Sequence, residues 1–133
     1  MERKPFDLSD RTFQFADAIL DWVQKCPRTL ITIELLRQLI RAATSVGANT
    51  EEAGDPQSDK DEASKLGIAL KEVRESRYWL RLLKKRVKEQ NTVDPLIQEA
   101  TELANILKSR IRNLQGPTNE QETIKGKKQR EIR

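Results

Sequence analysis

The chain has 133 residues, of which 36% are hydrophobic and 35% charged, with five glycines and five prolines. This composition fits one soluble domain of long helices with polar outer faces, and it argues against a β-sandwich, which needs frequent turns. Because the sequence has no histidine, an imidazole base, a Ser-His-Asp triad and a histidine metal site are excluded. The single cysteine, Cys26, excludes an internal disulfide and a cysteine zinc cluster, and it favours a cytoplasmic protein.

The net charge of +4 is unevenly distributed along the chain. Residues 71–90 hold eight Lys or Arg against three Glu, and residues 118–133 hold five against three. A polyanionic partner would therefore contact one helix and a tail. No run of 18 apolar residues occurs, and residues 1–5 lack the apolar core of a secretion signal, so we expect neither a membrane span nor a leader.

The first predicted helix begins at a polar cap, either Asp7 or Ser9, and ends before Pro27. Its apolar side chains recur at three- and four-residue steps: Phe15, Ala16, Ile19, Val23 and Cys26. The second predicted helix has one apolar side, formed by Leu36, Leu39, Ile40, Ala43, Val46 and Gly47. Gly54 and Pro56 predict a turn after it.

The third predicted helix begins at Ser58, which forms a weak capping box with Asp61, and runs to about Gln90. Its apolar side chains follow a seven-residue repeat that predicts left-handed supercoiling, with Leu66, Val73, Leu80 and Val87 in one row and Ala69, Ser76 and Leu83 beside it. A fourth helix is predicted from Asp94, the cap, and Pro95, the first helical residue, to Gly116.

Four amphipathic helices joined by short connections predict an all-α domain, an antiparallel up-down-up-down four-helix bundle over residues 7–116. The last residues, 117–133, are rich in Gln, Glu and Lys and contain few apolar side chains. Because such a segment cannot bury enough apolar surface to fold, we expect a disordered basic tail.

One side of the third helix is basic. The basic row is defined as Arg74, Arg77, Arg81, Lys84, Lys85 and Lys88, and it extends over about 20 Å of helix. Only Glu75 is acidic within residues 74–88, so ion pairs along the helix cannot neutralise the row. The row is either a solvated helix face or a phosphate-binding surface, which would bind nucleic acid weakly, with strong salt dependence and no sequence specificity.

A third side of the same helix is apolar. The apolar patch consists of Tyr78, Trp79 and Leu82, which lie outside the seven-residue repeat. Either Trp79 widens the core contact while the other two stay partly exposed, or the patch is a homo-oligomer interface. We favour the interface, because burying each such side chain stabilises by about 1.5–3 kcal/mol.

Two blocks of the sequence resemble a known family. Residues 37–52, RQLIRAATSVGANTEE, resemble the signature of a bacterial four-helix-bundle family encoded in intervening sequences of 23S ribosomal RNA genes. Residues 65–75, KLGIALKEVRE, and 78–83, YWLRLL, are similar to its second block. The resemblance extends over about residues 8–115 and does not include the tail.

The resemblance implies an up-down four-helix bundle that assembles into a homopentamer and has no established enzymatic activity. A related protein, the accessory variability protein of diversity-generating retroelements, has a similar fold and forms a basic pentameric barrel that contacts a reverse transcriptase and nucleic acid. By position, Tyr78 and Trp79 correspond to the family's Tyr-Trp pair, while Arg74, Arg77 and Arg81 correspond to its basic row.

Enzymatic and cofactor sites are poorly supported by the sequence. The glycines form no phosphate-binding loop, and Glu51, Glu52 and Glu72 are better explained as surface charges, or as partners of Arg41 and Arg74, than as cation ligands. With no neighbouring base, Cys26 is predicted to be a buried structural thiol.

We therefore expect a non-catalytic homo-oligomer without cofactor or metal, whose basic surface binds RNA, DNA or a nucleic-acid-processing protein. The alternative is a purely structural or scaffolding oligomer that does not bind nucleic acid.

Overall fold

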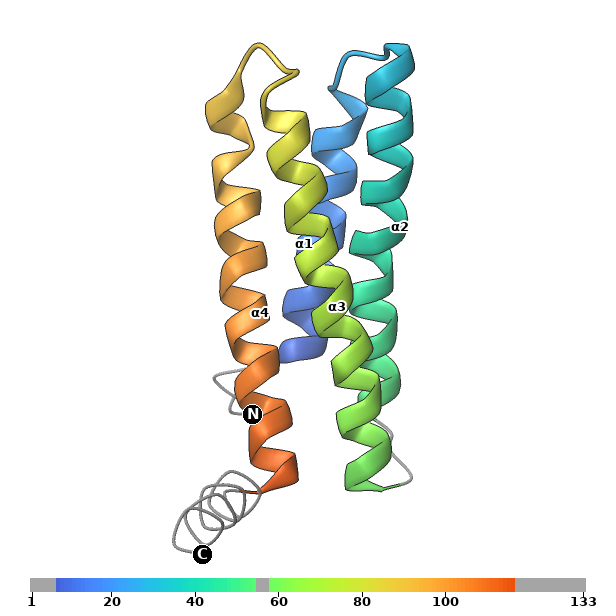
Figure 1. Ribbon diagram of the computed structural model, residues 1–133, viewed down its shortest axis with the longest axis vertical. Helices are drawn as coiled ribbons and strands as arrows, with labels where there is room; N and C mark the ends of the chain where they lie inside the picture. The colour runs from blue at the N-terminus through green and yellow to red at the C-terminus, as the bar shows by residue number, and fades with distance from the viewer. Residues whose placement is uncertain (1–6, 55–57, 117–133) are drawn as a thin grey trace, which may run out of the picture.

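The computed structural model describes residues 7–54 and 58–116. These residues form four α-helices and one short 3₁₀ helix: α1 (Leu8–Gln24), α2 (Leu30–Ala53), α3 (Asp59–Lys84), η1 (Gln90–Thr92) and α4 (Asp94–Gln115). Figure 1 shows the α1–α2 and α3–α4 connections at one end of the bundle, while α2 ends and α3 begins at the other. The predicted helical bundle is confirmed, whereas its supercoil handedness stays a prediction. The predicted tail, 117–133, lies outside the described residues.

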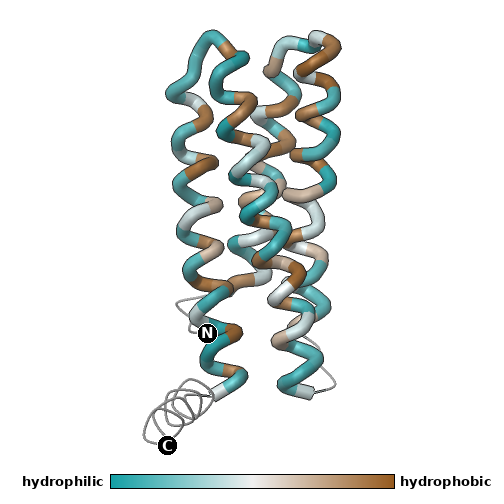
Figure 2. Tube along the Cα trace, in the orientation of Figure 1, coloured by the Kyte–Doolittle hydropathy of each residue, from teal (hydrophilic) through white to brown (hydrophobic). Residues whose placement is uncertain are grey.

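The core is assembled around α3, which packs against α2 on one side and α4 on the other. The predicted seven-residue repeat of α3 is buried from Leu66 to Leu83, and Val87, beyond the helix, also packs against the core. Hydrophilic and hydrophobic positions alternate along every helix in Figure 2, as expected when each helix buries one stripe. The largest fully buried side chains include Phe15, Ile19, Leu39, Leu80, Leu83, Leu103 and Leu107.

The helix starts depend on local hydrogen bonds. The Asp7 carboxylate accepts a hydrogen bond from the N–H of Asp10 at 3.1 Å, so Asp7, and not the other candidate Ser9, is the cap of α1. Ser58 accepts from the N–H of Asp61 at 3.0 Å and caps α3. The prediction of Asp94 as the cap of α4 is wrong, because Val93 occupies that position and is fully buried. The residue before the first helical residue is therefore a buried apolar one, and not the polar residue that the sequence pattern suggested.

The end of α3 also differs from the prediction, since the helix ends at Lys84 and not near Gln90. The Arg86 guanidinium donates to the carbonyl oxygen of Leu82 at 2.7 Å and satisfies one of the open carbonyls of the last turn. Lys84 Nζ lies 2.6 Å from Asp94 Oδ1 at the start of α4. Together with the packing of Val87 against the core, these contacts end α3 early and turn the chain toward α4.

Truncating Leu80 to Ala tests the assignment of the α3 repeat to the core. Leu80 is fully buried, so Leu80→Ala should lower the free energy of unfolding by about 2–5 kcal/mol through lost contacts and a cavity. Urea unfolding followed by circular dichroism measures the change. Ile68→Ala, on the same helix at a 41% exposed side chain, should cost less than about 1 kcal/mol. Equal losses for the two variants would contradict the assignment.

Candidate nucleic-acid interface

The structure divides the predicted basic row. Arg74, Arg77, Arg81 and Lys84 lie on α3, and Lys85 is its C-terminal cap residue. The prediction that all six cations share one helix face is wrong for Lys88, because α3 ends before it. Lys88 instead lines a separate open cavity with Trp22 and Cys26, at the end of the bundle where α1 finishes.

Four of the predicted cations meet in a shallow depression between α3 and α4, which we call the basic hollow. It has a volume of about 580 Å³, and its lining residues are Arg77, Arg81, Lys84, Lys85, Gln90, Asp94, Ile97 and Thr101. Asp94 is the only carboxylate in this lining, and it pairs with Lys84. Within residues 7–54 and 58–116, neither Arg77, Arg81 nor Lys85 makes a salt bridge. The hollow therefore carries uncompensated positive charge.

Two further cations on α4 were missed in the sequence analysis. Lys108 and Arg112 are exposed, and they follow Ile97 and Thr101 at spacings that keep them on the same stripe of α4. They extend the basic surface from the hollow along the α3/α4 side of the bundle. The sequence alone shows that Lys108 and Arg112 share one stripe of α4. It does not show that this stripe lies beside α3, so their contribution to the basic surface could not be predicted.

Of the two interpretations of the apolar patch, the structure supports the wider core contact of Trp79, while the homo-oligomer interface stays a prediction. Trp79 is half-buried against the core, and its Nε1 donates to Glu75 Oε1 at 3.4 Å. Tyr78 is 54% exposed, and its ring meets that of Trp79 edge-on, with centroids 5.1 Å apart and an interplanar angle of 71°. Leu82 is half-buried but does not join the core cluster. Trp79 thus widens the core, whereas Tyr78 remains on the surface.

Exposed apolar side chains at the start of α2 were not recognised from the sequence. Leu30, Ile31 and Ile33 are all exposed, Ile31 by 59%. Ile31 lies one helical turn before Leu35, which packs against the core. Because α2 begins at the end where α3 finishes, Ile31 lies at the same end of the bundle as Trp79 and Leu82 (Figure 1). The run Leu-Ile-Thr-Ile at residues 30–33 was the available signal.

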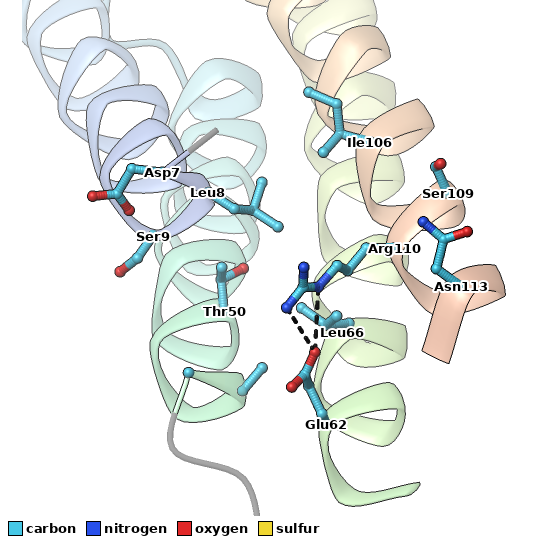
Figure 3. Close-up of a pocket in the computed structure, with 12 residues that line it drawn as sticks. Asp7, Leu8, Ser9, Thr50, Glu62, Leu66, Ile106, Ser109, Arg110 and Asn113 are labelled. Atoms are coloured by element: carbon cyan, nitrogen blue, oxygen red, sulfur yellow. Dashed lines mark hydrogen bonds and ion pairs between the residues drawn. The ribbon is translucent and has the colours of Figure 1, made fainter. Parts of the chain in front are cut away.

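Alternative sites on the described residues have simpler structural explanations. The end of the bundle where α1 and α3 begin contains an open cavity of about 810 Å³. Across this cavity, Arg110 of α4 pairs with Glu62 of α3 at 3.2 Å (Figure 3). Glu52 pairs with Lys65 at 3.1 Å, as expected for a surface charge. Cys26 is buried, and burial raises the pKa of its thiol to about 11, so the thiol stays protonated at neutral pH.

No group of three or more Cys, Asp or Glu side chains in residues 7–54 and 58–116 is arranged to hold a metal ion. In the same part of the chain, no helix has the length and apolar character that crossing a bilayer requires.

A carboxylate cluster beside Trp79 links α2 and α3. Arg41 Nη2 of α2 lies 2.7 Å from Glu75 Oε1, while Arg41 Nη1 lies 3.8 Å from Glu72 Oε2. Glu72 is only 8% exposed, and its Oε2 has no hydrogen-bond partner. Burial, followed by the adjacent charge of Glu75, raises the pKa of Glu72, and the positive charges of Arg41 and Lys71 only partly oppose this. The cluster thus orients Trp79, but burying the Glu72 carboxylate without a hydrogen bond to Oε2 costs stability.

Replacing Glu72 by Gln tests that cost. Because the pKa of Glu72 is raised on folding, its contribution to stability is complete below the unfolded pKa and is lost as pH rises through the folded value. Glu72→Gln should therefore increase the free energy of unfolding at pH 7, and the gain should shrink toward pH 4. Urea unfolding across this range measures it. Glu75→Gln, which removes the close partner of Arg41, should show no such gain. A Glu72→Gln variant less stable than the parent at pH 7 would contradict the prediction.

Comparisons with known proteins agree with the bundle and with the two sequence blocks. Residues 4–109 match the family model described as 23S rRNA-intervening sequence protein. A crystal structure of a protein with unknown function from the S23 ribosomal protein family of Bacteroides thetaiotaomicron is 32% identical, with a TM-score of 0.67 over 78% of this chain and 97% of that one. No curated protein matches the chain significantly. The chain belongs to the 23S rRNA-intervening sequence protein family.

Proposed function

We propose that the protein is a non-catalytic homo-oligomer that binds RNA or DNA through the basic hollow, without sequence specificity. The observation that carries this proposal is the meeting of Arg77, Arg81 and Lys85 in one hollow with no salt bridge among the described residues. A nucleic-acid-processing protein with an acidic surface is the second class of partner that the same cations would suit.

The guanidinium groups of the hollow are suited to binding the phosphates of a nucleic-acid backbone. Guanidinium groups donate paired hydrogen bonds to phosphate oxygens, and each neutralised phosphate releases condensed counterions. Lys108 and Arg112 lengthen the surface along α4, so that several phosphates of one backbone can bind together. Binding by such a surface should be weak and strongly dependent on salt, since no element is shaped to read base edges in a groove.

Self-association is the second part of the proposal, and apolar side chains on the α2/α3 side support it. Ile31, Leu35, Trp79 and Leu82 lie at one end of the bundle and keep part of their surface exposed. A contiguous apolar area with an aromatic residue is typical of protein interfaces. The resemblance noted in the sequence suggests five copies, while the purely structural oligomer remains the alternative function.

Charge reversal of the hollow tests nucleic-acid binding. Arg77→Glu combined with Arg81→Glu should weaken binding of a fluorescent 20-nucleotide RNA at least tenfold, and it should reduce the salt slope by about two. Fluorescence anisotropy between 50 and 200 mM salt measures both quantities. The matched control is Arg28→Glu combined with Arg37→Glu, which changes the net charge equally at exposed positions away from the hollow. Equal binding by the two double variants would favour the structural alternative.

Placing a charge in the apolar patch tests self-association. Leu82 is half-buried outside the core cluster, so Leu82→Asp should leave the monomer folded but add an unpaired charge to the contact between copies. Sedimentation equilibrium should show a particle several times the 15.4 kDa chain mass for the parent and a smaller one for the variant. A parent protein that sediments as a monomer at all concentrations would disprove this part of the proposal.

A further inference from the structure

Tyr78 stands at the border between the basic row and the apolar patch. On one side of it along α3 lie Arg74, one turn before, and Arg81, one turn after, while Glu75 and Leu82 occupy the corresponding positions on its other side. Both arginines are exposed, and neither makes a salt bridge with another described residue. Tyr78 is itself 54% exposed, which is the largest exposure of any aromatic side chain described on α3. An open aromatic ring is thus flanked by two unpaired cations on one helix surface.

The position of this ring is supported from one side. Arg41 holds the Glu75 carboxylate at 2.7 Å, and Glu75 accepts a hydrogen bond from the indole of Trp79. Trp79, held in this way against the core, contacts the Tyr78 ring edge-on at 5.1 Å between centroids. A ring that is already oriented loses less conformational entropy when a ligand stacks on it.

We propose that Tyr78 is a stacking platform for an unpaired base, so that the basic surface prefers single-stranded over base-paired nucleic acid. The inference rests on the proposed function and specifies its substrate class. Surfaces that bind single strands combine cations along the phosphate backbone with aromatic rings on which bases stack. Arg74 and Arg81 would bind phosphates on either side of the base that lies on Tyr78. In a duplex, the bases are stacked on one another and cannot reach this ring.

This inference moves Tyr78 out of the interface that the sequence analysis predicted. By helical register, Trp79 and Leu82 lie on the side of α3 that carries Glu75, the partner of Arg41 on α2, whereas Tyr78 lies toward Arg74 and Arg81. The contact between copies can therefore use the rest of the patch while the Tyr78 ring stays open. A direct consequence is that removing the ring should leave the mass of the oligomer unchanged.

The test compares two probes of equal charge. A 12-nucleotide oligodeoxyadenylate carries bases, and a 12-residue abasic oligonucleotide has the same phosphates without them. The full-length protein should bind the adenylate probe about tenfold more tightly than the abasic probe, as expected for one stacked base. Tyr78→Ala should abolish this difference, while Tyr78→Phe should keep it. Ile68→Ala, at another exposed apolar position of α3, is the matched control and should keep it too.

Each outcome separates this inference from the function on which it rests. If neither probe binds at 50 mM salt, the proposed nucleic-acid binding fails and the inference with it. If both probes bind equally, and only the Arg77/Arg81 reversal weakens binding, the function stands and the stacking inference is overturned. If Tyr78→Ala dissociates the oligomer in sedimentation equilibrium, Tyr78 belongs to the contact between copies, and the inference is likewise overturned.

Discussion

Burial of the α3 apolar row between α2 and α4 is the constraint on which the rest of the structure depends. The side chains of Leu66, Val73, Leu80 and Leu83 are buried in the core, so they set the rotation of α3 about its axis. At 100° per residue, this rotation directs Arg77 and Arg81 toward α4 and Trp79 toward α2. The chemistry of the outer surface is therefore a consequence of core packing, because a different rotation would expose apolar side chains and bury cations.

Ion pairs across the helix boundaries compensate positive charge on two other sides of the bundle. Arg41 uses Glu75 on the α2/α3 side, and on the α1/α4 side Arg11 lies 2.7 Å from Glu99. These pairs are partly exposed, and each adds little to stability. For binding, the important cations are those that have no such partner. The α3/α4 side has Asp94 as its carboxylate at the hollow, paired with Lys84, so the neighbouring arginines have no acidic partner within the described residues.

The sequence predicted the bundle well because each helix carries its own periodic apolar stripe and its own start signals. The buried repeat of α3 from Leu66 to Leu83 and the cap at Ser58 are confirmed, and Asp7 proves to be the cap among the two candidates for α1, since all depend on residues at most one or two turns apart. The end of α3 was mispredicted because it depends on contacts made beyond the helix, namely the pairing of Lys84 with Asp94, ten residues later, and the packing of Val87 against the core. Lys88 was wrongly placed on the basic row because the helix ends before it, and Lys108 was missed because the sequence does not show that α4 lies beside α3.

By itself, the sequence determined the number of helices, their buried sides and the excess of cations around the third one, because hydrophobic periodicity and charge are local properties. Only the tertiary structure decided which cations share a surface, which aromatic ring stays open and which carboxylate is left poorly solvated. Tyr78 and Trp79 are adjacent in the chain and similar in chemistry, yet one is exposed and the other packs against the core. That difference arises because neighbouring helices cover one direction around α3 and leave the next direction to solvent.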